Sequence, residues 1–136
     1  MKKILFVDDE TYSIEPYLDY LKSDAVGREV QHIHSYSNAL EAIMTRAPEY
    51  SSIILDVRIK PGREGNSTNE DFQIAGIRLY RQLRKLHPKA KVAILTHNFQ
   101  NVPLDEIAAD KYAIAVDKAQ YKPDELWRKI KELEQK

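Results

Sequence analysis

Residues 52–58 read Ser-Ile-Ile-Leu-Asp-Val-Arg, and this stretch decides the fold that we predict. Ile53, Ile54 and Leu55 form a short, continuous apolar run, which is typical of a strand covered on both faces of a parallel sheet. The run ends on Asp56. Residues at the carboxyl ends of such strands line the crevice where ligands bind. A carboxylate is costly to bury there, so Asp56 is either the cap of a turn or a functional residue.

The start of the chain repeats this pattern and favours the functional interpretation. The apolar run Ile4–Val7 predicts another buried strand, and it is followed directly by Asp8, Asp9 and Glu10. Three consecutive acids could simply form a solvated turn. Together with Asp56, however, they indicate that two strands deliver carboxylates to the same end of a sheet.

Three further runs predict the remaining strands. They lie at Val30–His34, Val92–Leu95 and Tyr112–Val116. The second of these is followed by Thr96, and the third is followed closely by Lys118. Both residues are therefore expected at the sheet end that carries the acids.

Apolar residues at helical spacing predict five helices between and after these strands. Ser13 and Ser37 are expected to cap the first two, residues 73–86 to form the third, and Pro103 and Pro123 to open the last two. The side chains expected to face the core are Ile14, Tyr17, Leu18, Leu21, Leu40, Ile43, Met44, Ile77, Tyr80, Leu83, Leu86, Leu126, Ile130 and Leu133. The short helix opened by Pro103 carries the apolar residues Leu104, Ile107 and Ala108.

Strands that alternate with helices predict an α/β fold, a doubly wound five-stranded parallel sheet with helices on both faces. Right-handed crossovers in a chain of this size favour the flavodoxin-like strand order 2-1-3-4-5. That order reverses between the first and third strands. Asp8, Asp9 and Asp56 should therefore converge at the point where a ligand is expected.

Composition limits the class of protein. The 136 residues suit a single domain spanning 1–136, and 21 basic residues balance 21 acidic ones, so nothing indicates direct nucleic-acid binding. The absence of cysteine excludes disulfides, thiolate metal sites and a cysteine nucleophile. No apolar run reaches the length of a membrane span and no signal peptide is evident, so we expect a cytoplasmic domain without membrane contact.

Five polar residues, in this order and each next to a strand end, carry a resemblance to a known family. They are Asp8 and Asp9 after the first strand, Asp56 after the third, Thr96 after the fourth and Lys118 after the fifth. In this pattern, which covers essentially the whole chain, the sequence resembles the receiver domain of bacterial two-component response regulators.

The resemblance implies a role for each of these residues. Asp56 would be the phosphoacceptor, with Thr96 and Lys118 contacting the phosphoryl oxygens. Asp8, Asp9, Asp56 and the backbone carbonyl of Arg58 would bind Mg²⁺ or Mn²⁺. The partners would be a sensor histidine kinase or a histidine phosphotransfer protein in a phosphorelay, together with a downstream effector.

Elementary chemistry supports these roles independently. A carboxylate that attacks phosphorus meets a dianionic phosphoryl group, so their repulsion has to be neutralised. A hard cation held by carboxylates provides one positive charge and Lys118 provides a second, compact one. Thr96 offers a hydroxyl donor on a short, stiff side chain.

Three residues depart from the family pattern. His97 follows the threonine where a small residue is usual, and we interpret it as an outward-pointing loop residue, with a gate over Asp56 as the alternative. Ala119 follows the lysine where proline is common. Ala115 stands where many receivers carry a switching aromatic residue, and Tyr112 lies on the opposite side of that strand.

A long polar loop is predicted at about 60–72, directly after the acceptor strand. Lys60 and Arg63 in this loop could reach over Asp56. His32 and His34, two residues apart on the second strand, could bind a metal together. Without a third ligand, we interpret them as a solvated face.

Three functions remain open at this point. The first is a phosphorylatable switch that assists its own phosphorylation and dephosphorylation without being an enzyme in the usual sense. The second is a pseudo-receiver, an interaction module that works without phosphorylation. The third is a Mg²⁺-dependent phosphohydrolase, but the haloacid-dehalogenase type requires a second acid two residues after the nucleophile, where this chain has Arg58.

Overall fold

The computed structural model describes residues 3–59, 74–97 and 99–136, and these form the parallel sheet that the sequence predicts. The strands are joined in the order β2-β1-β3-β4-β5, so the predicted order 2-1-3-4-5 is confirmed. All neighbouring strands are parallel. Their bounds are β1 Lys3–Val7, β2 Val30–Ile33, β3 Tyr50–Leu55, β4 Val92–Thr96 and β5 Ala113–Asp117.

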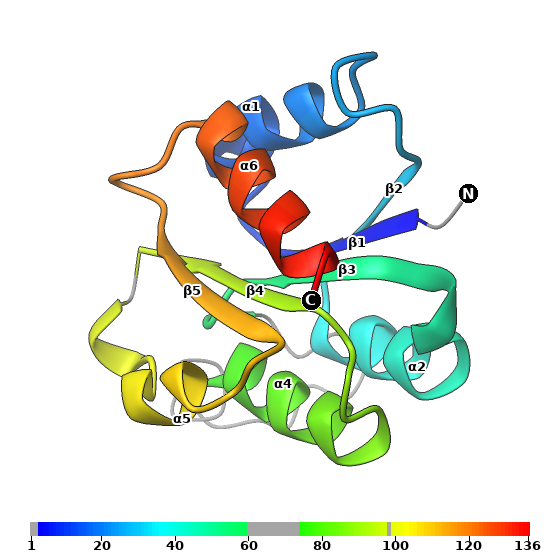
Figure 1. Ribbon diagram of the computed structural model, residues 1–136, viewed down its shortest axis with the longest axis vertical. Coiled ribbons are helices and arrows are strands. Elements are labelled where there is room, and N and C mark those ends of the chain that lie inside the picture. The colour runs from blue at the N-terminus through cyan, green and yellow to red at the C-terminus, as the bar shows by residue number, and fades with distance from the viewer. Residues whose placement is uncertain (1–2, 60–73, 98) are drawn as a thin grey trace.

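Helices cover both faces of the sheet. In Figure 1, α1 and α6 lie above the sheet, while α2, α4 and α5 lie below it. The bounds are α1 Thr11–Leu21, α2 Tyr36–Arg46, α4 Ala75–Leu86, α5 Leu104–Ala108 and α6 Pro123–Glu134. Two short 3₁₀ turns, η1 Ala47–Glu49 and η2 Phe99–Asn101, complete the described elements.

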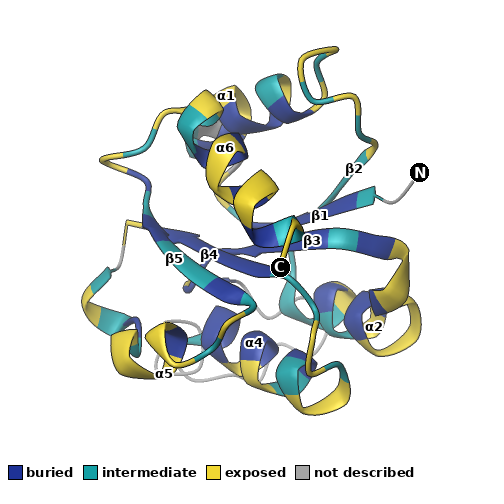
Figure 2. Cartoon of the chain, viewed as in Figure 1, coloured by how far each residue is buried: buried dark blue, intermediate teal, exposed yellow. Residues whose placement is uncertain are grey.

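Each face of the sheet carries its own apolar core because side chains alternate along a strand. On β1, Ile4 and Phe6 pack into the cluster with α1 and α6, whereas Leu5 and Val7 pack into the cluster with α2 and α4. All four side chains are fully buried. Figure 2 shows this pattern as largely dark blue central strands β1, β3 and β4, whereas the edge strands β2 and β5 are partly teal. The central strands are therefore covered on both sides, as their continuous apolar runs indicate.

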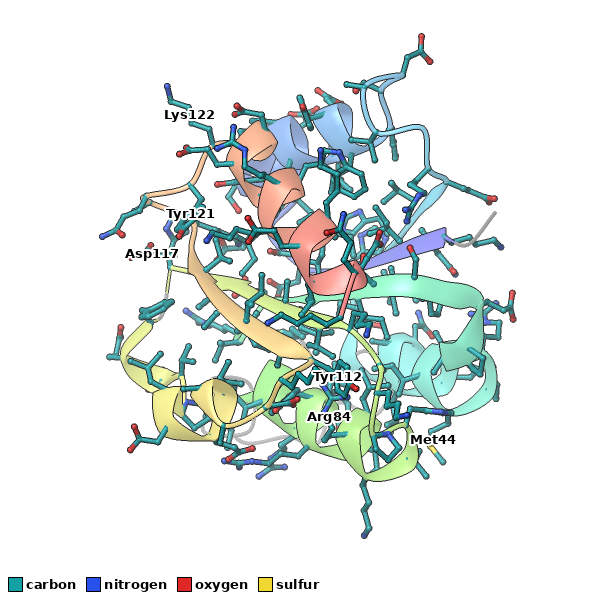
Figure 3. All side chains as sticks on the ribbon, in the orientation of Figure 1. Met44, Arg84, Tyr112, Asp117, Tyr121 and Lys122 are labelled. Atoms are coloured by element: carbon teal, nitrogen blue, oxygen red, sulfur yellow. The ribbon has the colours of Figure 1, made fainter. Side chains whose placement is uncertain are left out.

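Two predicted core residues are exposed instead. Met44 is 54% exposed (Figure 3). Helix α2 buries one stripe of side chains, Ala39, Ala42 and Ile43, and Met44 lies one residue further along the helix, where its side chain points away from that stripe. Leu86 is 44% exposed, because it is the last residue of α4 and lines an open groove. Both predictions were wrong for the same reason, which is that apolar residues at a helix edge continue the pattern without reaching the core.

The caps of the first two helices also differ from the prediction. The side chain of Ser35, not Ser37, accepts the cap hydrogen bond of α2, from the Asn38 N–H at 3.4 Å. Helix α1 begins at Thr11, two residues before Ser13, and its N-cap residue Glu10 makes no side-chain cap bond. A serine near a helix start therefore indicates the helix correctly but places its first turn one or two residues too late.

The predicted loop at about 60–72, with Lys60 and Arg63, lies outside the described residues. Within the ranges that the structure describes, no helix is long and apolar enough to cross a membrane.

Candidate functional site

The sheet brings the predicted acids together at the carboxyl ends of β1 and β3. These strands are neighbours, with Val7 opposite Leu55, so that Asp8 and Asp56 leave the sheet side by side. The backbone N–H of Asp56 continues the ladder by donating to the carbonyl of Val7 at 3.0 Å. Both side chains are buried, Asp8 completely and Asp56 to 3% exposure. The strand-end argument from sequence therefore places these two carboxylates correctly.

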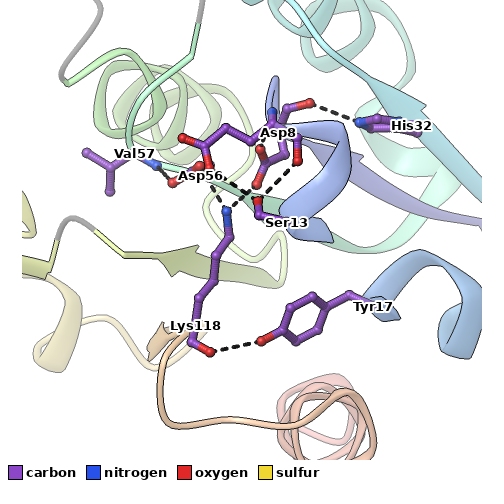
Figure 4. Close-up of polar contacts among 8 residues, drawn as sticks. Asp8, Ser13, Tyr17, His32, Asp56, Val57 and Lys118 are labelled. Carbon is purple, nitrogen blue, oxygen red and sulfur yellow. Dashed lines mark hydrogen bonds and ion pairs between the residues drawn. The ribbon is translucent and has the colours of Figure 1, made fainter. Parts of the chain in front are cut away.

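Lys118 reaches the same point from the end of β5. Its ammonium Nζ lies 2.7 Å from Oδ2 of Asp8 and 3.2 Å from Oδ2 of Asp56 (Figure 4). The lysine is itself buried, with 6% of its surface exposed. One positive charge is thus shared between two carboxylates, away from solvent.

Burial and charge shift the pKa values of this group. Burial raises the pKa of Asp8 to about 7, and the nearby charge of Asp56 adds to this rise, which the contact with Lys118 only partly offsets. Burial alone would lower the pKa of Lys118, but the charges of Asp56 and Asp8 outweigh it, so that this pKa is raised. The site therefore holds a permanent cation next to more negative charge than that cation can neutralise.

The second oxygen of each carboxylate is held by the backbone. Oδ1 of Asp8 accepts from the Glu10 N–H at 2.8 Å, and Oδ1 of Asp56 accepts from the Val57 N–H at 2.7 Å. Each carboxylate is therefore fixed by one backbone donor on one oxygen and by Lys118 on the other. This arrangement keeps both Oδ2 atoms directed at the same point.

The remaining predicted site residues lie at or next to the carboxyl ends of β1, β3 and β4. Thr96 is fully buried at the end of β4, and its carbonyl accepts from the Lys118 N–H at 3.1 Å. Asp9 is half-buried next to Asp8, and the Arg58 side chain is exposed. His97 is exposed, as we interpreted it from the sequence.

Strand β5, which precedes Lys118, carries Ala115 at the position where many receivers have a switching aromatic residue. Ala115 lies on β5, opposite Ile94, and is half-buried. Tyr112 ends just before the strand, which begins at Ala113. The Tyr112 ring lies under the ammonium of Lys91, 4.1 Å from the ring centre, and so packs away from the carboxylate group.

The described residues contain no group of three acidic, histidine or cysteine side chains already arranged to hold a metal ion. Two of the proposed ligands nevertheless fit a cation, because the Oδ2 atoms of Asp8 and Asp56 both contact one ammonium. Their donor atoms are carboxylate oxygens, which hard divalent cations such as Mg²⁺ prefer.

Three further residues contact this site and were not predicted from the sequence. Gly76 lies in the first turn of α4, where its N–H donates to the Val57 carbonyl at 2.8 Å. A Cβ atom at this position would lie 1.7 Å from the Asp56 carbonyl oxygen, so only glycine lets α4 approach. A glycine near a helix start, where it is unfavourable, was the available signal.

The other two missed residues contact the site through its backbone. Nε2 of His32 donates to the Asp8 carbonyl at 2.9 Å, and burial lowers the pKa of this half-buried histidine. His32 is therefore not part of a solvated face, although His34 is exposed. The Tyr17 hydroxyl donates to the Lys118 carbonyl at 3.0 Å. No local sequence pattern indicates either contact.

Known structures share this fold over nearly the whole chain. A receiver domain protein from Methanospirillum hungatei JF-1 matches with a TM-score of 0.73 and 23% identity, covering 99% of this chain and 94% of that one. A receiver domain protein from Clostridium thermocellum matches with a TM-score of 0.72 and 19% identity, covering 99% and 95%. No protein-family model matches the sequence, and the curated proteins give no match either.

A further structure extends the likeness from fold to sequence. The response regulator protein TrrA from Thermotoga maritima, solved in complex with Mg²⁺ and BeF, is 30% identical to this chain, with a TM-score of 0.71. The match covers 98% of this chain and 99% of that chain. On this evidence, the chain belongs to the receiver domain family of response regulators.

Proposed function

We propose that this receiver domain is a phosphorylatable switch in a two-component phosphorelay, with Asp56 as the phosphoacceptor. The observation that carries the proposal is the buried Lys118 ammonium shared by the Asp8 and Asp56 carboxylates. A structural ion pair needs one carboxylate, whereas this lysine has two. The second negative charge destabilises the resting site and suits a site that receives a further cation and a phosphoryl group.

In the proposed reaction, a carboxylate oxygen of Asp56 attacks the phosphorus of a phosphohistidine. The new P–O bond forms an aspartyl phosphate as the P–N bond breaks, and the departing histidine nitrogen keeps the electron pair and takes a proton from water. The Lys118 ammonium, already 3.2 Å from Asp56, is placed to bind a phosphoryl oxygen. The Thr96 hydroxyl is proposed to donate to another.

We assign Mg²⁺ or Mn²⁺ binding to Asp8, Asp9, Asp56 and the backbone carbonyl of Arg58. The fit rests on the two buried carboxylates that converge on one positive charge and on the raised pKa of Asp8. When bound, the cation supplies positive charge that offsets the repulsion between Asp56 and the incoming phosphoryl group. Asp8 and Asp9 contribute by holding this charge next to Asp56.

The proposed donor is a sensor histidine kinase or a histidine phosphotransfer protein, and the proposed compartment is the cytoplasm. The chain assists transfer to and from its own side chain and acts on no other substrate in this proposal. A phosphohydrolase is less well supported, because Arg58 occupies the place of the second acid that such enzymes use. A pseudo-receiver is less well supported because Asp8, Asp56, Thr96 and Lys118 are all buried at one end of the sheet.

Intact mass after incubation with acetyl phosphate and Mg²⁺ tests the proposal. We expect one added phosphoryl group, which is lost in excess chelator and absent from Asp56→Asn. Asp105→Asn, which changes an exposed acid on α5, is the matched control and should be phosphorylated normally. Phosphate that persists on Asp56→Asn would overturn the assignment of Asp56, and no added mass on the parent chain would favour the pseudo-receiver.

A further inference from the structure

Tyr17 connects helix α1 to the turn that carries Lys118. The tyrosine is buried, with 6% of its surface exposed, and its hydroxyl lies 3.0 Å from the Lys118 carbonyl and 2.7 Å from the Tyr121 carbonyl. The hydroxyl has one hydrogen to donate, and both carbonyl oxygens lie within hydrogen-bond distance of it. Figure 4 shows the ring extending from α1 toward the Lys118 backbone, opposite the carboxylates that bind its ammonium.

The main chain of Lys118 is therefore held on both sides. Its N–H donates to the Thr96 carbonyl at 3.1 Å, and its carbonyl accepts from Tyr17. The Lys118 side chain is flexible and ends in a compact charge, so the position of its Cα atom sets how far the stem must reach for the ammonium to contact both carboxylates. The two backbone bonds fix that Cα atom between β4 and α1.

Within the described residues, the turn's own hydrogen bonds do not hold the Lys118 carbonyl. Its hydrogen bonds from Ala119 N–H and Gln120 N–H, at 2.9 and 3.0 Å, both return to Asp117 and so act within the turn. Ala119 directly follows Lys118, so this turn lacks the fixed φ that a proline ring would impose there. Among the described residues, the hydrogen bond from the Tyr17 hydroxyl ties the Lys118 carbonyl to helix α1.

We propose that Tyr17 is a positioning residue for phosphoryl transfer, which holds Lys118 so that its ammonium bridges Asp8 and Asp56. The expected effect of Tyr17 on phosphorylation rests on the proposed function, whereas its expected effect on the position of Lys118 does not. Burial raises the pKa of Tyr17, so the hydroxyl stays a donor throughout the physiological pH range. The residue acts through the backbone and touches neither the carboxylates nor the phosphoryl group.

Tyr17→Phe tests this proposal, with Tyr50→Phe as the matched control. Tyr50 is buried to the same extent, at 7% exposure, and its hydroxyl donates to the Gln31 side chain at 2.6 Å, at the opposite end of β3. Both changes keep the ring and remove one hydroxyl group, which contacts the Lys118 and Tyr121 carbonyls at Tyr17 and the Gln31 side chain at Tyr50. A general loss of stability should therefore appear equally in both variants.

Two readouts separate positioning from stability. The first is hydrogen exchange of the Lys118 ammonium by ¹⁵N NMR without metal, which should speed up roughly three- to tenfold in Tyr17→Phe, the factor expected for loss of one hydrogen bond. The second is the rate of phosphorylation by acetyl phosphate with Mg²⁺, which should fall by a similar factor. Tyr50→Phe should change neither by more than about twofold.

The outcomes are distinct. Unchanged ammonium exchange in Tyr17→Phe overturns the proposal, as does an equal change in Tyr50→Phe. Faster exchange without phosphorylation of any variant, the parent chain included, would retain the link to Lys118 and reject the proposed function. If Tyr17→Phe fails to fold, the reverse measurement replaces it. Lys118→Met should then shift the Tyr17 ¹³Cζ resonance but not that of Tyr50, and an unshifted Tyr17 resonance overturns the link.

Discussion

Two clusters of charge, one buried and one half-buried, lie at different places on this fold and differ in how well they are neutralised. At the carboxyl end of the sheet, Asp8 and Asp56 share Lys118. Near the start of β5, Asp110 has a partner of its own, because Oδ2 accepts from Nε of Arg84 at 2.7 Å and also from the Tyr80 hydroxyl. Figure 3 shows Arg84 beside Tyr112, away from the carboxyl ends of the strands.

The pKa values of the two aspartates shift in opposite directions. Burial would raise the pKa of Asp110, but hydrogen bonds from Tyr80, the Tyr112 N–H and Arg84 outweigh it, and the pKa is lowered. At Asp8, burial and the second carboxylate prevail and raise the pKa to about 7. A fully paired carboxylate stabilises a fold, whereas an incompletely neutralised one is kept at a cost to stability, which is typical of a functional site.

Helix α4 connects these two clusters. Its first turn touches the Asp56 backbone through Gly76, and its later turns supply Tyr80 and Arg84 to Asp110. A groove of about 610 Å³ lies beside Asp110 and is lined partly by Arg84 and Tyr112. Its lining combines Tyr80, Arg84 and Asp110 of the neutralised cluster with the exposed ion pair of Arg81 and Glu106. The concave surface of the groove is therefore less informative about function than the charge balance of the acids.

The largest expected effect comes from breaking the contact between α4 and the site. Gly76→Ala should destabilise the protein by at least about 3 kcal/mol, because the added Cβ overlaps backbone atoms that cannot move independently. Thermal unfolding measures this loss. Gly27→Ala is the control, since Gly27 has positive φ but open space around it, and about 1–2 kcal/mol is expected there. Equal losses at both glycines would show that α4 does not need this close approach.

The pH dependence of metal-free stability should expose the Asp8 shift. Because the folded-state pKa of Asp8 lies above its ordinary value of 3.8, the folded protein binds the extra proton between these values. Stability should therefore fall as pH rises from 5 to 8, by up to roughly 3 kcal/mol at about 1.4 kcal/mol per pH unit.

Urea unfolding at several pH values, without metal, measures this slope. Asp8→Asn should remove it while leaving the histidine contributions unchanged. A parent chain whose slope equals that of Asp8→Asn would contradict the raised pKa.

The same substitution should act differently in the two clusters. Asp110→Asn should cost about 2 kcal/mol, because it weakens charge-assisted bonds from Arg84. In metal-free protein at pH 8, Asp8→Asn should cost less than this or stabilise the fold, since it relieves repulsion with Asp56. Denaturant unfolding of both variants tests the difference. A larger loss for Asp8→Asn would mean that the site is neutralised as fully as Asp110.

The smallest effect is expected at a buried hydroxyl outside both clusters. Ser52 lies on β3 with 1% exposure, and its Oγ has no hydrogen-bond partner among the described residues. Ser52→Ala should therefore change stability by less than about 1 kcal/mol, and in the stabilising direction. A clear loss of stability of Ser52→Ala in thermal unfolding would contradict this prediction, because it would show that the Ser52 hydroxyl has a hydrogen-bond partner.

The sequence was sufficient for the fold and for the residues next to strand ends, because both follow from local patterns. Apolar runs identified the strands, and the residue after each run identified Asp8, Asp56 and Thr96. Tyr17 could not be found in this way, since its hydroxyl meets a carbonyl 101 residues later. Its apolar ring and helical spacing correctly predicted burial but gave no sign of the hydrogen bond.

Charge balance also escaped prediction. Lys118 and Arg84 are both basic residues near acids in space, but only the three-dimensional contacts show that one serves two carboxylates and the other serves one. The exposed Met44 and Leu86 show the corresponding limit for the core, where helical spacing fixes a face but not its edge. Charge balance and burial at a helix edge depend on contacts between residues far apart in the chain, and the sequence therefore could not predict them.

The most direct test of this account is a ¹³C NMR titration of the aspartate carboxyl groups in metal-free protein. We predict that Asp8 takes up its proton at a pH near 7, whereas the pKa of Asp110 lies below its ordinary value. Addition of Mg²⁺ should then lower the pKa of Asp8. Titration of Asp8 near 3.8 would contradict the account, because the two clusters would then be equally well neutralised.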